Sequence, residues 1–164
     1  MATGRSMQVT KQAGEYLACA ELCRRGFIAT TFTGNVPAFD ILAMNDKGVT
    51  KLIQVKTIRK DSWQFNALDY LKISISSRDI QTITGKQDLE NPDLICILIK
   101  LNEQGKEEFY ILRLKDLQDI VFEEYRAWLK THGGKRPRKP LSLHTAVRPK
   151  DLSDCRNNWT LLEE

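Results

Sequence analysis

Apolar and β-branched positions along the first third of the chain predict a helix followed by strands. Residues 8–25 predict a helix, and Gly26 stands where a glycine commonly ends one. Residues 27–32, 40–44 and 51–58 are rich in β-branched or apolar side chains and predict three strands. A polar turn joins the last two. Residues 63–65 are expected to extend the same sheet.

The rest of the chain predicts two more strands and two helices around an unclear middle. The unbroken apolar run at 94–101 predicts a central strand buried on both faces, and 109–114 predicts its returning neighbour. Apolar residues at helical spacing predict helices at 115–131 and 151–162. The pattern at 66–93 is ambiguous, and we expect a short helix near 77–84. This order of elements favours a mixed α/β layer structure.

Composition limits the class of protein. The chain has 164 residues, 41% hydrophobic and 28% charged, which fits one domain spanning 1–164. No apolar run reaches the roughly 18–20 residues that a membrane span needs. Residues 1–11 lack the apolar core of an export signal, so we expect a cytoplasmic, reduced protein. The cysteines form no CxxC pair, and Cys19 and Cys23, four apart in a helix, are interpreted as buried thiols.

The net charge of +4 comes from one segment of the chain. Acidic and basic groups cancel over 1–129, whereas the loop expected at 132–150 and its flank hold seven basic groups and no acidic one: Lys130, Lys135, Arg136, Arg138, Lys139, Arg148 and Lys150. Cations placed on phosphates release counterions, so this segment is a candidate nucleic-acid contact. A solvated, solubilising loop is the alternative interpretation.

Glu15 stands out in the first helix. It projects in line with Cys19 and Leu22, opposite the charged side of the helix. A carboxylate on an apolar face is costly unless it is paired or binds a cation. Alternatively, Glu15 lies near the helix start, where the helix dipole favours a negative charge and water reaches it.

The strand at 51–58 carries a second polar anomaly. Gln54 and Lys56 point to one side of it, and Ile53 and Val55 point to the other. A hairpin with the preceding strand would place Asp40 beside them. Taken singly, Asp40 is typical of a strand end and Lys56 of a solvated edge. Together the three residues would bring a carboxylate, an amide and an ammonium group to one point.

These residues resemble a known pattern. Gly14-Glu15, then Phe39-Asp40-Ile41-Leu42, then Ile53-Gln54-Val55-Lys56-Thr57 resemble the PD-(D/E)XK nucleases, and most of all the branch with Q-x-K in place of E-x-K. A group I intron homing endonuclease belongs to that branch. The resemblance covers most of 13–162 and implies a restriction-endonuclease-like mixed β-sheet flanked by helices, with an αβββαβ core.

The resemblance also implies roles for individual residues. Asp40 matches the main ligand of a divalent metal, Gln54 takes the second acidic position, and the carbonyl of Val55 would be a further ligand. Lys56 matches the lysine that positions the attacking water, and Glu15 matches the helix glutamate near the metal. Mg²⁺, or Mn²⁺ in its place, suits such oxygen ligands and would serve phosphodiester hydrolysis.

Two departures from the family pattern bear on function. Pro37 lies three residues before Asp40 instead of directly before it. Gln54 is neutral, so the site carries two negative charges where a glutamate would give three, and metal affinity should fall. The leading hypothesis is therefore a metal-dependent DNA endonuclease. A non-catalytic DNA-binding module on the same fold and a protein-interaction role are the alternatives.

Partners follow from the same hypothesis. The expected nucleic-acid contacts are Lys135, Arg136, Arg138, Lys139, Arg59 and Lys60. A homodimer, or a higher homo-oligomer, would suit cutting of both strands of a duplex. With His132 and His144 as its two histidines, the chain offers no HExxH pair, and it has no GxxxxGK[ST] or GxGxxG loop. His132 is interpreted as a helix-end residue, and Trp63, Trp128 and Trp159 as core.

Overall fold

The first helix ends as its sequence predicts. The computed structural model describes residues 4–32 and 38–164, and α1 spans Gly4–Arg24. Gly26 adopts a φ of 87°, and the N–H of Phe27 donates to the carbonyl of Leu22 at 3.1 Å. Glycine takes this left-handed conformation without the strain that a Cβ adds. The helix starts earlier than the predicted residue 8, whereas its end is confirmed.

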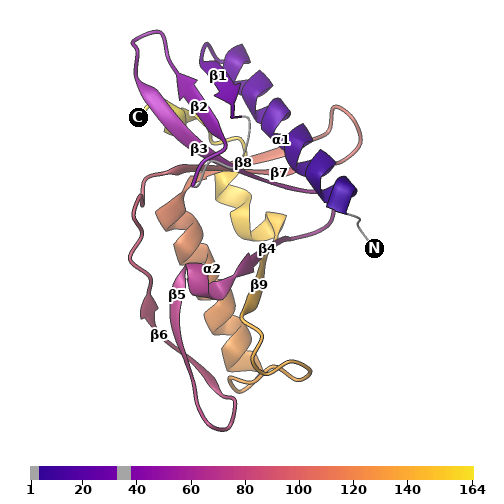
Figure 1. Cartoon of the computed structure of the whole chain (residues 1–164), viewed down its shortest axis with the longest axis vertical. Coiled ribbons are helices and arrows are strands. Elements are labelled where there is room, and N and C mark those ends of the chain that lie inside the picture. Colours follow the sequence, from indigo (N-terminus) through magenta and orange to yellow (C-terminus); the bar gives the residue numbers. More distant parts are fainter. Residues whose placement is uncertain (1–3, 33–37) are drawn as a thin grey trace.

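A five-stranded mixed sheet forms the centre of the molecule, with strands in the order β1-β2-β3-β7-β8 (Figure 1). Its strands are β1 (Ile28–Thr31), β2 (Ile41–Met44), β3 (Thr50–Ile58), β7 (Ile95–Lys100) and β8 (Glu108–Arg113). β3 and β7 run parallel, and the other neighbours are antiparallel. The predicted mixed sheet flanked by helices is confirmed.

The central strand β7 is buried on both faces, as its unbroken apolar run predicts. Ile95, Ile97 and Ile99 pack into the hydrophobic cluster that α1 covers. Cys96 and Leu98 point the other way, into the cluster that contains the apolar side of α2 (Leu114–Thr131). Both clusters therefore rest on one sheet, and α1 and α2 cover its opposite faces.

The segment between β3 and β7 is where the sequence pattern is misleading. It forms β4 (Trp63–Asn66), the 3₁₀ helix η1 (Ala67–Asp69), β5 (Leu71–Ile75) and β6 (Gln81–Lys86). The expected short helix at 77–84 is wrong, because β5 and β6 pair as an antiparallel hairpin. The Ser76 hydroxyl accepts the N–H groups of Arg78 and Ile80 and fixes the turn. Among the described residues, the one helical element between β3 and β7 is therefore η1, and the long helix α2 comes only after β8.

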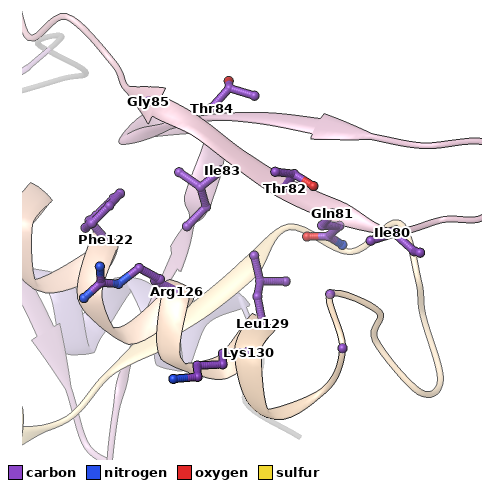
Figure 2. A pocket seen from close by; sticks show the side chains of 12 residues that line it. Ile80, Gln81, Thr82, Ile83, Thr84, Gly85, Phe122, Arg126, Leu129 and Lys130 are labelled. Carbon is purple, nitrogen blue, oxygen red and sulfur yellow. The ribbon is translucent and has the colours of Figure 1, made fainter.

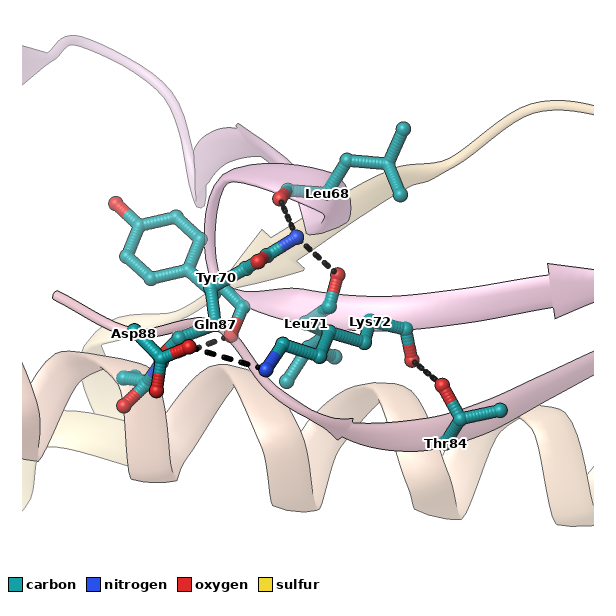
Figure 3. A network of polar contacts seen from close by, with 8 residues as sticks. Leu68, Tyr70, Leu71, Lys72, Thr84, Gln87 and Asp88 are labelled. Atoms are coloured by element: carbon teal, nitrogen blue, oxygen red, sulfur yellow. Dashed lines mark hydrogen bonds and ion pairs between the residues drawn. The ribbon is translucent and has the colours of Figure 1, made fainter.

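Buried and half-buried amides hold this hairpin to the rest of the molecule (Figure 3). Gln87 donates to the carbonyls of Leu68 and Leu71 at 3.2 and 3.3 Å. The buried Gln118 of α2 donates to the carbonyls of Tyr70 and Gln87 at 2.9 and 2.8 Å. These bonds satisfy backbone carbonyls where the hairpin meets η1 and α2.

The C-terminal part differs from the expected helix at 151–162. Within the predicted basic loop, His144–Val147 form β9, which pairs antiparallel with β4. Two 3₁₀ helices follow, η2 (Pro149–Cys155) and η3 (Trp159–Leu162). The chain leaves the helix at Asn157, which has a φ of 53° and donates its N–H to the carbonyl of Phe109 at 2.9 Å. Pairing with the edge strand β8 thus replaces helical hydrogen bonds.

All four cysteines are free thiols. Cys96 is buried, and burial raises its pKa to about 12. The interpretation of Cys23 as a buried thiol is wrong, because this residue is exposed at the end of α1. In the part of the chain that the structure describes, no helix combines the length and apolarity needed to cross a bilayer.

Candidate active site

A cleft of about 520 Å³ opens at the edge of β3, just before β2 begins at Ile41. The two strands pair only as far as Ile41 opposite Ile53, so no strand of the described residues pairs with β3 on this edge from Gln54 onward. The cleft is lined by Lys11, Asp40, Gln54, Val55, Lys56, Thr57, Ile58, Trp63 and Gln64. It therefore brings together Asp40, Gln54 and Lys56, as the hairpin prediction requires.

Asp40 is fixed against β3 by two hydrogen bonds. Its N–H donates to the carbonyl of Ile53 at 2.8 Å, and its Oδ2 accepts the N–H of Val55 at 2.8 Å. The carboxylate thus takes the place of the next backbone acceptor of β2. Because the N–H and C=O of a strand residue point to the same edge, the carbonyl of Val55 also faces the side of Asp40.

Lys11 lies between the two carboxylates of the site. Its Nζ is 3.4 Å from Oδ1 of Asp40 and 3.5 Å from Oε1 of Glu15. Burial works to lower the pKa of Lys11, but the charges of Asp40 and Glu15 outweigh it and raise that pKa. Sequence reasoning missed Lys11, although its spacing of four residues from Glu15 on one helix is the signal of an ion pair.

Glu15 lies well inside α1, so its interpretation as a water-exposed residue of the helix start is wrong. Its side chain is 15% exposed. Burial first, and then the negative charge of Asp40, raise the pKa of Glu15, while Lys11 opposes the shift. The positive charge of Lys11 therefore does not fully offset the combined effect of burial and Asp40 on the pKa of Glu15.

Lys56 enters the cleft from the face of β3 that lies away from α1. Its Nζ lies 5.6 Å from the centre of the Phe65 ring, and among the described residues it forms no ion pair. Its backbone carbonyl accepts the indole N–H of Trp63 at 3.0 Å, which holds the start of β4 beside the site. Lys56 thus offers a positive charge that no carboxylate of the described residues takes up.

A glycine lets α1 approach β3 closely enough to place Glu15. A Cβ on Gly14 would lie 1.8 Å from Oγ1 of Thr57, closer than atoms can pack. The Thr57 hydroxyl is buried there without a hydrogen-bond partner. Gly14 is therefore a packing requirement of the site, and this explains a residue that the family resemblance includes.

The expected nucleic-acid contacts divide into two groups. Lys135 is 3.4 Å from Asp79, Arg59 donates to the Thr10 hydroxyl at 2.9 Å, and the Arg136 guanidinium lies 4.5 Å from the Trp128 ring. These three side chains already have partners within the chain. The others are exposed and form no ion pair among the described residues: Lys60, Arg138 and Lys139.

The basic loop is held in place by a buried amide. Gln81, 3% exposed, donates to the carbonyls of Pro140 and Ser142 at 2.6 and 3.1 Å. It also accepts the hydroxyl of Tyr125. Arg136 donates to the carbonyl of His144 from the other side of the loop. The loop is therefore packed on α2 and β6.

The prediction that the tryptophans belong to the core is confirmed for Trp63. Its side chain is 2% exposed and packs edge-on against Tyr110. Trp128 and Trp159 are half-buried and hold cations, with the Arg25 guanidinium 4.1 Å from the Trp159 ring. His132 lies at the end of α2, stacked on Trp128 with ring centres 4.1 Å apart. The prediction of a helix-end histidine is confirmed.

A second cavity, of about 550 Å³, lies between β6 and α2 (Figure 2). Ile83, Phe122 and Leu129 give it an apolar wall, and Arg126 and Lys130 stand at its border. No carboxylate among the described residues lines it to act as an acid, a base or a metal ligand.

Asp40, Gln54 and Val55 bring oxygen atoms to the lining of the cleft, whereas Glu15 is not among its lining residues and is linked to Asp40 through Lys11. Over 4–32 and 38–164, no three His, Cys, Asp or Glu side chains gather as a metal-binding group. Magnesium accepts such a set, since it prefers oxygen ligands and retains waters. The ammonium of Lys11 shows that a cation fits between the two carboxylates.

No protein-family model and no curated protein sequence matches the chain. Its fold nevertheless has a match among solved structures, which defines the chain as having a nuclease-like α/β fold. That structure is described as a bacterial homing endonuclease, I-Ssp6803I. The two align with a TM-score of 0.55 over 96% of this chain and 93% of the other, at 11% sequence identity. At this identity the likeness concerns the fold.

Proposed function

We propose that the chain is a PD-(D/E)XK-type, metal-dependent DNA endonuclease with a Q-x-K site. The observation that carries the proposal is the hydrogen bond from Val55 N–H to Asp40, which fixes the carboxylate beside Gln54 and Lys56 in one cleft. The fold likeness to a protein described as a homing endonuclease supports it. Both clusters of the core share one sheet, so we treat 1–164 as a single domain.

In this proposal Asp40 and Glu15, with the Gln54 amide and the Val55 carbonyl, hold Mg²⁺ or Mn²⁺. The bound ion would activate a water molecule and neutralise charge on the phosphate. Lys56 stabilises the charge that develops on the phosphate, and its freedom from carboxylates leaves it available for that role. Gln54 contributes no charge, so the site relies on Asp40 and Glu15 for its attraction of cations.

Lys11 has two successive roles in the proposal, one before the metal binds and one afterwards. Its ammonium compensates for the two carboxylates before the metal binds, and it must leave that position when the metal enters. The exposed stem of Lys11 allows such a movement, because its side chain is 59% exposed. Once displaced, Lys11 is a cation at the mouth of the cleft, where a DNA phosphate would lie.

A cleavage assay tests the proposal. Supercoiled plasmid is incubated with the protein and Mg²⁺ or Mn²⁺, alongside the variants Lys56→Met and Lys51→Met. Both lysines lie on β3, but Lys51 lies outside the cleft, opposite Ala43 of β2. We expect Lys56→Met to slow cleavage on the order of 100-fold or more, since preorganised charge contributes that much to such transition states. Equal rates in both variants, or no nicking by the wild type, would refute the proposal.

Non-catalytic DNA binding on the same fold is the second candidate. The neutral Gln54 and the ammonium of Lys11 beside Asp40 favour it, because together they reduce the demand for a metal. It predicts salt-sensitive DNA binding that is unchanged by EDTA. Metal-dependent strand scission would exclude it, and absence of both DNA binding and metal binding would favour a protein-interaction role.

For the endonuclease, a homodimer is proposed for cutting both strands of a duplex.

A further inference from the structure

The ribbon formed by β4 and β9 has one buried and one outward face. Trp63 and Phe65 of β4, and Thr145 and Val147 of β9, are buried against the core that contains α2. The outward face presents the side chains between them: Gln64, Asn66, His144 and Ala146. The pairing places Gln64 opposite Ala146 and Asn66 opposite His144. This face is small and mostly polar, and its three polar side chains, those of Gln64, Asn66 and His144, are exposed.

We infer that this outward face reads base edges in the major groove of duplex DNA. The inference rests on the proposed function, which it deepens by naming the surface that selects the sequence. The major groove, about 12 Å wide, admits a two-stranded β-ribbon. Amide side chains such as those of Gln64 and Asn66 match the donor and acceptor pattern of adenine, and an imidazole such as that of His144 adds a further polar group.

The ribbon is continuous with the proposed active site. Gln64 and Trp63, at one end of it, line the same cleft as Asp40 and Lys56. Four residues of strand extend about 10 Å, the length of about three base pairs. A duplex whose scissile phosphate lies in the cleft would therefore place the next few base pairs along the ribbon.

Exposed cations stand at both ends of the ribbon in the chain. Lys60 precedes β4 and Arg148 follows β9 at the end that borders the cleft. Arg138 and Lys139 precede β9 at the other end. None of these four forms an ion pair among the described residues, so each is available for a phosphate. Phosphate contacts on both sides would fix the register in which the ribbon meets the bases.

The groups at the ribbon are held in place before any DNA arrives. Gln64 donates to the Ser62 hydroxyl at 2.6 Å, and Asn66 accepts the N–H of Leu68 at 3.2 Å. Asn66 thereby caps η1, so its replacement would disturb the backbone. Gln64 and His144 have no such duty in their side chains, which makes them suitable positions for substitution.

Binding selection without metal tests the inference separately from cleavage. A pool of randomised duplexes is selected in EDTA by the wild type, by Gln64→Ala and His144→Ala, and by the control Gln104→Ala in the exposed turn before β8. We expect the wild type to select a preferred sequence. Gln64→Ala and His144→Ala should each relax it at neighbouring positions and weaken binding to the selected site at least about fivefold. Binding to non-selected duplex and the selection by Gln104→Ala should stay unchanged.

The outcomes separate this inference from the proposed function. An unchanged preference in both ribbon variants, or duplex binding by the wild type without any preference, would overturn base reading by the ribbon even if the plasmid is cut. Conversely, a preference that depends on Gln64, in a protein that never cuts DNA, would support the ribbon and refute the endonuclease. Absence of duplex binding at any salt concentration would overturn both.

Discussion

The cleft on β3 and the basic loop before β9 are both rich in charge, yet they are built in different ways. The cleft rests on the two-sided apolar core: Ile53 and Val55 of its strand are buried, and Gly14 lets α1 pack directly on it. The basic loop rests on polar bonds, chiefly those of the buried Gln81. The strand that carries the site is thus held by packing, whereas the loop is held by a few directional bonds.

The difference also concerns how charge is used. In the cleft, Lys11 lies within ion-pair distance of both Glu15 and Asp40, so the balance of charge is a property of the group. In the loop, Lys135 and Arg136 are occupied by partners within the chain, while Arg138 and Lys139 are exposed. Charge in the cleft is thus shared within one group of side chains, whereas the exposed loop cations are separate and, in the proposed function, would bind phosphates weakly and additively.

Giving the cleft a third negative charge should have the largest effect on metal affinity. We expect Gln54→Glu to tighten Mg²⁺ or Mn²⁺ binding about tenfold or more, because two unit charges about 4 Å apart interact by about 1–4 kcal/mol in partly exposed sites. Titration calorimetry measures the change. The matched control is Gln104→Glu, an exposed position remote from the cleft. Equal affinity in the two variants would contradict the account of a charge-poor site.

Removing the amide that supports the loop should lower stability. Gln81→Ala leaves the carbonyls of Pro140 and Ser142 and the hydroxyl of Tyr125 without their partner. Each unsatisfied buried group costs about 1–3 kcal/mol, so the free energy of unfolding in urea should fall by at least that amount. Limited proteolysis should show faster cutting within 132–142. If Gln104→Ala destabilises the protein equally, the loop does not depend on Gln81.

The exposed loop cations should act through salt. Replacing both Arg138 and Lys139 with alanine should reduce the slope of log affinity against log salt concentration by about 0.9 for each phosphate that the variant no longer neutralises. Anisotropy with a fluorescent duplex between low and physiological salt measures the slope. Lys47→Ala combined with Lys106→Ala removes the same charge from turns elsewhere. A slope that changes as much in this control would show that the effect is one of net charge alone.

The smallest expected effect is on pH dependence. The pKa of Glu15 is raised in the folded state by burial and by Asp40, so folding favours its protonated form. The contribution of Glu15 to stability therefore falls as pH rises through its titration range. Glu15→Gln should remove this fall and melt at an equal or higher temperature than the wild type at neutral pH. The difference in melting temperature between Glu15→Gln and the wild type is measured at pH 4 and at pH 7. If the variant is less stable relative to the wild type at pH 7 than at pH 4, the raised pKa of Glu15 is contradicted.

Local patterns predicted the sheet well because its strands satisfy their own sequence preferences. The run at 94–101 and the end of α1 at Gly26 needed no knowledge of distant residues. The hairpin of β5 and β6 and the two 3₁₀ helices at the end of the chain did need it. Asn157, for example, leaves a helical pattern because its N–H meets the carbonyl of Phe109.

The candidate site shows the same limit. The sequence predicted that Asp40, Gln54 and Lys56 lie close together, and in the structure all three line one cleft. It did not predict Lys11, whose role depends on Asp40 arriving from another element. Nor did it show that Lys135 has a partner within the chain. Pro37 lies outside the described residues, so its place relative to Asp40 stays a prediction from the sequence.

The most direct test of the central claim compares two isosteric substitutions in one cleavage assay. Asp40→Asn keeps an oxygen that can accept the Val55 N–H but loses the negative charge, whereas Asp46→Asn makes the same change in the exposed turn between β2 and β3. With Mg²⁺ and plasmid DNA, the account predicts cleavage by the wild type and by Asp46→Asn, and a loss on the order of 100-fold or more in Asp40→Asn. Cleavage by Asp40→Asn at the wild-type rate would contradict it.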